Sequence, residues 1–272
     1  FIIFAIIADE SVPRLFLAGV IPGLMQAGLF VLWIMYYTRK RKYPVEEGLP
    51  RDQFLAVNLN AIPALLLPVI VLGGIYGGFV TVTEAAALSA LVSIVVSVYF
   101  YKGCRAGEVL GLVGESVRIT AVIVFIIAGA LLFGHWITDA GIASDLVEFV
   151  VSHDLEAWQF LLFINVLMLL LGMFLEVIAV ILITVPIVLP ILEQLGISTI
   201  HYAVVVTVNM ELALLTPPIG LNLYVLSSIS KAPIGEVIRG TLPFILIMLC
   251  LLLVVTYIPA ISLWLPEMVY GK

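Results

Sequence analysis

The sequence predicts an all-α, polytopic membrane protein. Of its 272 residues, 63% are hydrophobic and only 11% are charged, and the mean hydropathy is +1.25. Soluble domains carry charge on about a quarter of their residues, so this composition fits lipid as the solvent. Several uncharged runs exceed the roughly 20 residues that a helix needs to cross a bilayer. The runs are 15–37, 53–83, 85–101, 119–138, 157–175, 212–230 and 241–266.

A transmembrane β-barrel does not fit the pattern. Its strands would be segments of about ten residues that alternate apolar and polar side chains, and the sequence contains no such segments. Helices must therefore satisfy the backbone polar groups, and any irregular backbone must be sheltered by protein or by a wet cavity.

The basic residues indicate the orientation of the helices. Most of the 12 Lys and Arg residues fall within 39–51, 102–118 and 231–239, which we expect on the cytoplasmic side. No Lys or Arg occurs between Ile119 and Ser230. Five acidic residues crowd one part of that stretch, which should face outward: Asp139, Asp145, Glu148, Asp154 and Glu156.

This orientation predicts a re-entrant hairpin over residues 157–194. The segment must leave from and return to the outer side, because the next basic residue follows only after one more crossing. Its second arm, 177–192, has 16 uncharged residues, or about 24 Å of helix, which is short of a full crossing. The alternative is two tilted full spans joined by a tight turn at Gly172.

The two ends of the chain resemble each other, which suggests an inverted repeat. At offsets of 220 and 221, the matched pairs are Phe4 with Tyr224, Pro13 with Pro233, Gly19 with Gly240 and Pro22 with Pro243. We expect 1–60 to end a first repeat and 61–272 to form the second. Within the second repeat we expect helices over 61–118, a hairpin and a broken helix over 119–232 and a terminal helix over 233–272. With Phe1 first and no signal peptide pattern, the chain is expected to begin in mid-structure.

The segment from Asn209 to Asn222 contains the sharpest local feature. Thr216, Pro217 and Pro218 precede Gly220 within an apolar stretch. Two consecutive prolines remove two backbone donors, so the helix is expected to break. Freed carbonyl groups at membrane depth need a partner, and a desolvated cation is one. The half-helix after Gly220 would direct amide groups at an anion. A kink in a packed helix is the alternative.

A second break is expected at GGIYGG, residues 73–78, because four glycines in six residues permit close helix packing or non-helical backbone. Thr81, Thr83 and Glu84 follow. These side chains either line a polar cavity, or Thr83 caps a helix that starts at Glu84.

Glu176 and Glu211 are acidic residues in apolar surroundings. An intramembrane carboxylate is a functional candidate because its burial is costly, and a buried glutamate keeps proton coupling open. Alternatively, Glu176 lies at a wet hairpin tip and Glu211 bonds a neighbouring helix.

Other chemistries lack a motif. His135, His153 and His201 are spread out, and HExxH is absent, so we expect no transition-metal centre. The chain has no GxSxG elbow, P-loop or dinucleotide fingerprint, so neither an enzyme nor an organic cofactor is expected. Basic and aromatic residues do not interleave as they do in nucleic-acid-binding proteins.

Three long segments make the sequence recognisable. GGIYGGFVTVTEAAALSA (73–90), LLLGMFLEVIAVILITVPIVLPILEQLGI (169–197) and NMELALLTPPIGLNLYV (209–225) resemble the large membrane subunit of tripartite ATP-independent periplasmic (TRAP) transporters. The resemblance spans essentially the whole chain. It implies the C-terminal part of that subunit, without its N-terminal half. The family often has Pro at Val82 and Asp-Pro at Glu176 and Val177.

The resemblance implies an elevator-type importer in the inner membrane. A small membrane subunit would support the scaffold, a periplasmic binding protein would deliver a carboxylate such as a C4-dicarboxylate or sialic acid, and sodium would drive uptake. The implied sodium-binding residues are Gly172, Phe174, Glu176, Thr216, Pro217, Gly220 and Asn222. The substrate cavity would take in Thr81, Thr83, Glu84, Asn209, Glu211 and Pro218.

Two other functions compete with this interpretation. One is a stand-alone sodium- or proton-coupled carboxylate carrier that needs no binding protein. The other is an intramembrane enzyme or assembly protein that uses Glu176 and Glu211 as paired acids, for which no motif is present.

Overall fold

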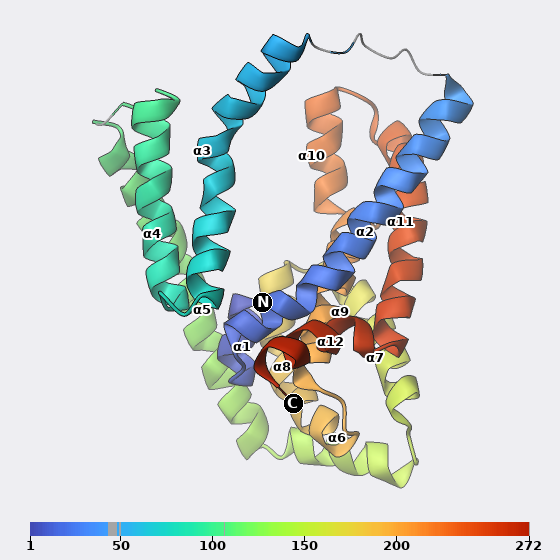
Figure 1. Cartoon of the computed structure of the whole chain (residues 1–272). Helices are drawn as coiled ribbons and strands as arrows, with labels where there is room; N and C mark the ends of the chain where they lie inside the picture. Colours follow the sequence, from blue (N-terminus) through green and yellow to red (C-terminus); the bar gives the residue numbers. More distant parts are fainter. Residues whose placement is uncertain (43–47, 49, 106, 272) are drawn as a thin grey trace. The chain divides into compact units, whose positions relative to one another are not determined.

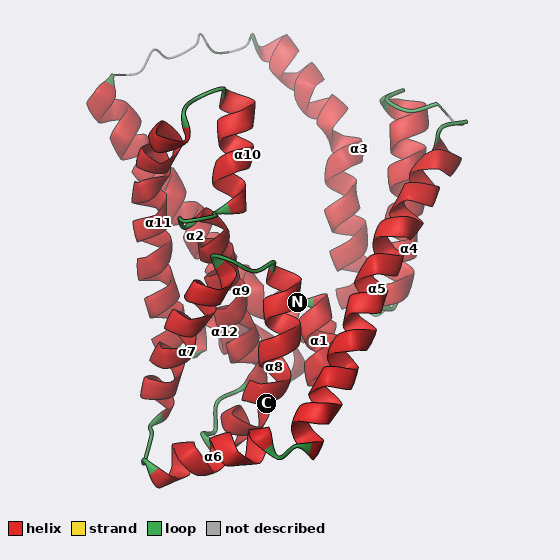
Figure 2. Cartoon of the chain, turned by 180° about the vertical axis from the view of Figure 1, so that it is seen from behind, coloured by secondary structure: helices red, strands yellow, loops and turns green. Residues whose placement is uncertain are grey.

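The computed structural model describes residues 1–42, 48, 50–105 and 107–271, and this part of the chain contains helices and no strands (Figures 1 and 2). The predicted all-α class is confirmed. The helices are α1 (Ile2–Ala8), α2 (Val12–Arg41), α3 (Arg51–Tyr76), α4 (Val82–Val95) with a π-helical turn (Val96–Phe100), α5 (Val109–Asp139), α6 (Ile142–Ser152), α7 (Ala157–Gly172), α8 (Val177–Gln194), α9 (Thr199–Leu215), α10 (Leu221–Ser230), α11 (Ile234–Tyr257) and α12 (Ala260–Tyr270).

Six of the described helices are long and apolar enough to cross a membrane. They are Val12–Arg41, Gln53–Tyr76, Val82–Phe100, Val109–Ile137, Val177–Gln194 and Ile234–Tyr257. Helices α7, α9 and α10 are apolar but shorter. The polytopic character predicted from the uncharged runs is thus confirmed.

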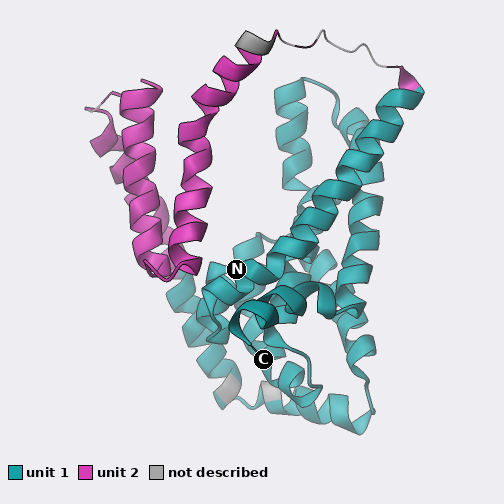
Figure 3. Ribbon diagram, in the orientation of Figure 1, with its two compact units in different colours: residues 1–40, 126–272 teal, residues 41–125 magenta. Residues whose placement is uncertain are grey.

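The chain divides into two compact units, residues 1–40 with 126–272, and residues 41–125 (Figure 3). In the smaller unit, the glycine-rich segment ends α3 at Tyr76, and the chain turns into α4, which packs on α3. The hydroxyl of Tyr101 donates a hydrogen bond of 2.6 Å to the backbone oxygen of Asn60. The expected break at 73–78 is therefore a tight connection between two packed helices.

Helix α9 lies at the centre of the larger unit, and most of its residues are buried. One side of the helix packs in a cluster with α1, α7 and α8, in which the ring of Tyr202 lies 6.2 Å from that of Phe4. The other side packs on α11 through residues that include Leu212 and Leu252. A helix that is apolar on all sides is stable only when protein or lipid surrounds it, and here protein does.

Buried amide and hydroxyl groups connect three helices of this unit. Asn209 on α9 donates to the amide oxygen of Asn165 on α7 at 2.7 Å, and Asn165 donates to the hydroxyl of Thr256 on α11 at 2.9 Å. The three residues are 0%, 3% and 1% exposed, respectively. Because polar groups buried in apolar surroundings are costly when unpaired, this chain of bonds fixes the register of α7, α9 and α11.

The two ends of the chain have the same local architecture. A short helix, α1 or α10, ends at a residue with left-handed backbone, Asp9 (φ 51°) or Lys231 (φ 54°), and a long helix follows. In Figure 1, α2 and α11 run in opposite directions, and they meet where the rings of Phe30 and Phe244 lie 5.2 Å apart. The inverted repeat stays a prediction that these features agree with. Its boundary at residue 60 is not tested by them, and residue 60 lies inside α3.

The hairpin predicted over 157–194 consists of α7, the turn at residues 173–176, and α8. Helix α7 has 16 residues and α8 has 18, or about 24 and 27 Å of helix. Helix α7 is shorter than a full span, whereas α8 is one of the six helices long and apolar enough to cross a membrane. The choice between a re-entrant hairpin and two tilted spans stays a prediction.

The buried amide chain predicts a stability effect. Replacing Asn165 by Leu leaves the amide nitrogen of Asn209 without its acceptor, which should cost about 1–2 kcal/mol. We expect a clear fall in the melting temperature of the detergent-solubilised protein, measured by intrinsic fluorescence.

Asn58→Leu is the matched control, because this exposed asparagine on α3 bonds only the backbone oxygen of Phe54 in its own helix. Equal melting temperatures for the two variants would contradict a structural role of the amide chain.

Candidate ion and substrate site

The helix break predicted at Thr216 is present. Helix α9 ends at Leu215, Thr216 has extended backbone (φ −97°, ψ 129°), and the peptide bond between Pro217 and Pro218 is cis. Gly220 then adopts φ 47°, and a Cβ atom there would lie 2.8 Å from a methyl carbon of Leu223 and 3.1 Å from the carbonyl oxygen of Thr216. Only glycine fits this turn without strain.

The break leaves backbone groups unpaired. Among the described residues, no hydrogen bond is accepted by the carbonyl oxygens of residues 216–219, whereas Gly220 accepts one from the amide of Leu223. No side chain caps the start of α10, where Asn222 is exposed. The hydroxyl of Thr216 donates to the backbone oxygen of Leu212 at 2.7 Å and keeps its acceptor lone pairs. The segment thus offers oxygens to a cation and amides to an anion.

The hairpin tip is the second part of the predicted sodium site. Gly172 is the last residue of α7 and is buried, whereas Phe174 and Glu176 are exposed. The carboxylate of Glu176 caps α8 by accepting hydrogen bonds from the amides of Ile178 (2.9 Å) and Ala179 (3.3 Å). An acidic cap also complements the positive end of the helix dipole. Exposure and capping of Glu176 agree with the alternative of a hairpin tip, and its role as an ion ligand stays a prediction.

The fold brings the tip and the end of α9 together. A Cβ atom at Gly172 would lie only 2.7 Å from the Cβ atom of Ala213 and 3.2 Å from the terminal methyl carbon of Met210. Ala213 lies three residues before Thr216 and its backbone oxygen accepts the Thr216 amide. The absence of a side chain at Gly172 therefore sets the distance between the hairpin and the last turn of α9.

Two predicted cavity residues on α9 have structural partners. Glu211 is exposed, and its carboxylate accepts a hydrogen bond of 2.6 Å from the amide nitrogen of Gln26 on α2. The alternative in which Glu211 bonds a neighbouring helix is the one observed. Asn209 is fully buried and bonds Asn165, and its own amide oxygen has no hydrogen-bond partner in the described structure. In this structure Asn209 belongs to a helix interface, whereas Pro218 is exposed at the break.

In the smaller unit, the polar residues after the glycine-rich segment form a capping box. Thr81 precedes α4 and its hydroxyl accepts from the amide of Glu84 (3.3 Å), while the carboxylate of Glu84 accepts from the backbone amide of Thr81 (2.7 Å). Capping was the expected alternative, but its residue was wrong: the cap is Thr81, and Thr83 lies inside a helix that begins at Val82. The Thr-x-x-Glu spacing explains this, because both partners are in reach only from Thr81.

Sequence reasoning missed Asn165 and Thr256, which hold Asn209 in place. A single asparagine within the uncharged run 157–175 is the signal for Asn165, because an amide at that depth needs a partner. His201, which is buried, lies nearby in the same region: its Nε2 atom is 3.1 Å from the backbone oxygen of Thr256, and its Nδ1 atom is 3.3 Å from the hydroxyl of Ser262. These contacts occupy both ring nitrogens.

Comparison with known proteins assigns the family. Residues 1–261 match the model of the tripartite ATP-independent periplasmic transporter, DctM component. The C4-dicarboxylate TRAP transporter large permease protein DctM of Pseudomonas aeruginosa is 42% identical over 266 residues, which are 98% of this chain and 62% of that protein.

Relatives with other names match over nearly the same part of the chain. The isethionate TRAP transporter permease protein DctMQ of Oleidesulfovibrio alaskensis is 34% identical over 97% of this chain and 42% of its own length. The sialic acid TRAP transporter large permease protein SiaM of Vibrio cholerae is 32% identical over 99% of this chain and 63% of its own length. The chain thus spans less than two thirds of each of these relatives. The family model matches nearly the whole length of this chain, which is therefore a multi-pass protein of the inner membrane. The chain belongs to the DctM component family of TRAP transporters.

Proposed function

We propose that the chain is part of the permease subunit of a sodium-coupled importer. The importer takes organic acids, such as C4-dicarboxylates or sialic acid, from a periplasmic binding protein. The observation that carries the proposal is the break between α9 and α10, where four consecutive carbonyl oxygens lack hydrogen bonds beside the tip of a hairpin. Family membership and the anionic compounds in the names of the relatives support it.

Sodium would bind at the break. A hard cation favours oxygen ligands, and unwound carbonyl groups supply them without the cost of desolvating a charge. The hydroxyl of Thr216 and the amide oxygen of Asn222 flank these carbonyls in the sequence. From the tip, the backbone around Gly172, Phe174 and Glu176 would complete the proposed ion site with Pro217 and Gly220.

An organic anion would bind at the start of α10. The first amides of a ten-residue helix point out of its N-terminal end, and the partial positive charge there favours a carboxylate. A cation held by the preceding carbonyls adds to this attraction. Each ligand then raises the affinity for the other by the same factor, which is the coupling that symport requires.

An elevator movement would carry this site across the membrane. Helix α7 contacts α9 at two positions, through Gly172 with Ala213 and through the hydrogen bond between Asn165 and Asn209. The hairpin and the broken helix would therefore move as one body. We propose a small membrane subunit and a soluble periplasmic binding protein as partners. A cavity role for Thr81, Thr83 and Glu84 stays a prediction.

The rival functions have weaker support. Glu176 and Glu211 are each engaged by a different partner, the amides at the start of α8 and the side chain of Gln26, which favours structural roles over a pair of catalytic acids. A carrier without a binding protein would use the same break, so only transport measurements separate it from the proposal.

The test of the proposed function uses the complete transporter in proteoliposomes. We expect uptake of a labelled organic acid only when an inward sodium gradient and the binding protein are both present. Uptake without added binding protein would support the stand-alone carrier, and uptake driven equally by a proton gradient without sodium would overturn sodium coupling.

Thr216→Val tests the ion site. The variant keeps the shape of the side chain but removes an oxygen at the break, and the loss of one ligand should weaken sodium binding about tenfold or more. We expect a matching rise in the sodium concentration that gives half-maximal uptake, with normal insertion into the membrane. Asn222→Ala should act in the same direction.

Thr207→Val is the matched control for Thr216→Val. Thr207 lies on the same helix, and its hydroxyl makes the same kind of bond, to the backbone oxygen of Ala203 at 2.8 Å. If both valine variants shift the sodium dependence equally, the oxygen of Thr216 is not an ion ligand.

Gly172→Ala tests the contact between the tip and α9. A methyl group there would overlap Ala213, and overpacking of this kind costs about 1–3 kcal/mol. We expect about a tenfold or greater loss of sodium-driven uptake, because the tip is displaced from the break.

Gly129→Ala is the control, since a Cβ atom at that position on α5 meets nothing within 4 Å. Wild-type uptake by Gly172→Ala would show that the close approach has no role in transport.

A further inference from the structure

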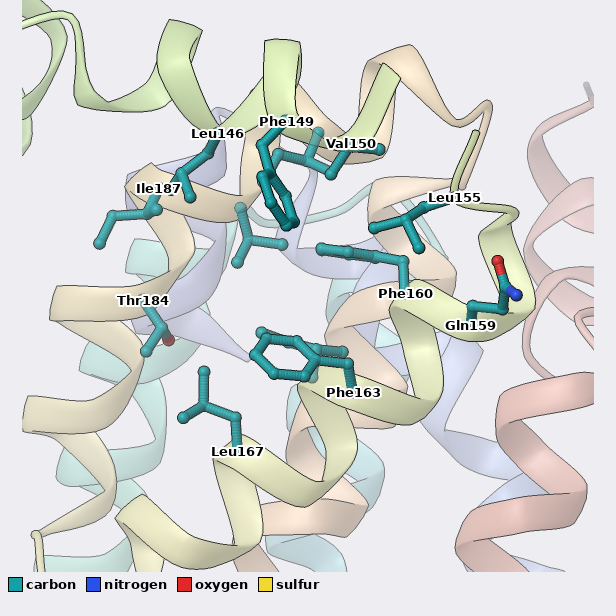
Figure 4. A pocket seen from close by; sticks show the side chains of 13 residues that line it. Leu146, Phe149, Val150, Leu155, Gln159, Phe160, Phe163, Leu167, Thr184 and Ile187 are labelled. Carbon is teal, nitrogen blue, oxygen red and sulfur yellow. The ribbon is translucent and has the colours of Figure 1, made fainter. Parts of the chain in front are cut away.

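An apolar cavity of about 470 Å³ lies between α6, α7 and α8, away from the hairpin tip (Figure 4). Its walls come from residues 159–167 of α7 and 184–191 of α8, and α6 packs on α8. Side chains from all three helices face the cavity, among them Leu146, Phe149, Phe163, Leu167, Thr184 and Ile187. Its volume lies within the range of about 300–1,000 Å³ that is typical of ligand sites.

The lining does not suit water or a polar ligand. Thr184 already donates its hydroxyl to the backbone oxygen of Val180 at 2.6 Å, and the amide oxygen of Gln159 accepts from the backbone amide of Glu156 at 2.9 Å. The other lining side chains are apolar. A water molecule needs two to four polar partners, which this cavity does not offer. An apolar occupant is therefore favoured.

The surroundings place the cavity near the membrane surface. Helix α6 is amphipathic: Phe149 and Val150 face the cavity, whereas Asp145 and Glu148 are exposed. The exposed ring of Trp158 follows and donates its indole N–H to Glu156. Tryptophan and charged side chains lie at the level of lipid headgroups, and helices with one apolar face lie along that level. The cavity thus opens where acyl chains begin.

The acidic side chains near the cavity favour a lipid headgroup that carries a positive charge. The acidic side chains at 145, 148, 154 and 156 are exposed, and the stretch 119–230 contains no Lys or Arg. His135 pairs with Asp139 at 3.5 Å, and His153 contacts Ser152 and the backbone oxygen of Phe149. An anionic headgroup would be repelled, whereas an ammonium group would be attracted.

We propose that the cavity binds one acyl chain of a bilayer phospholipid whose headgroup ends in an ammonium group, such as phosphatidylethanolamine. The bound chain would fill the space between the two arms of the hairpin and hold them apart at the outer end. The site is separate from the proposed ion and substrate site, so it does not depend on the proposed function.

Native mass spectrometry of the complete transporter tests the proposal. The purified protein is delipidated and then titrated with phosphatidylethanolamine or phosphatidylglycerol. We expect one phosphatidylethanolamine to be retained, and about tenfold less when Leu167→Trp or Ile187→Trp fills the cavity from opposite walls, the loss that follows from excluding about two methylene groups.

Leu170→Trp is the matched control, because Leu170 lies on the same helix, is 51% exposed and does not line the cavity. Replacing Asp145 by Asn and Glu148 by Gln together should reduce the preference for phosphatidylethanolamine about tenfold, as expected for two weak charge interactions.

Three results would overturn the proposal. They are equal retention by the cavity-filling and Leu170→Trp proteins, no retained phospholipid in the unmodified transporter, and equal retention of phosphatidylglycerol. The second and third results are measured on the unmodified transporter, so they test the proposal even if a substituted protein does not fold. Another part of the complete transporter that fills the cavity would give the second result.

Discussion

The hydrogen-bonding requirement of the backbone in a lipid environment governs this structure. Hydrocarbon offers no partner to an N–H or C=O group, so a helix that stops inside the membrane must be sheltered by protein or must bind something. Helix α9 ends before residues 216–219, whose carbonyl oxygens accept no hydrogen bond among the described residues, and α9 is the most deeply enclosed helix of its unit. The unpaired carbonyl groups thus follow directly after α9, the helix whose position is best defined by packing.

The two arms of the hairpin are held in different ways. Helix α7 is fastened to α9 in its middle, by the amide of Asn165, and at its end, by the close approach of Gly172. These two positions are seven residues, or about two helical turns, apart on one face. Helix α8 instead packs mainly on α1 and α6, and an apolar cavity separates its C-terminal part from α7. The position of α8 therefore depends on α1 and α6 more than on α7.

Much of this fold was predictable because each decisive signal is local. Paired prolines followed by glycine break a helix whatever surrounds them, and the break at Thr216 was predicted from those residues alone. The glycine-rich end of α3 follows from an equally short pattern. Asn165 and Thr256 were missed because a hydrogen bond between residues 91 positions apart depends on which helices become neighbours. No local pattern contains that information.

The acidic residues show why the candidate site was harder to predict than the fold. The rule that an intramembrane carboxylate is functional singled out Glu176 and Glu211, and Glu84 was a candidate because it follows the glycine-rich segment. A carboxylate within three residues of a helix start finds backbone donors without any tertiary contact, and both Glu176 and Glu84 are held in this way. Glu211 lies inside a helix, where the backbone offers it no donor, so it takes one from Gln26 on another helix. Only a carboxylate in that position must obtain its partner from tertiary structure, and for this reason Glu211 is the acid whose environment changes if α2 and α9 move apart.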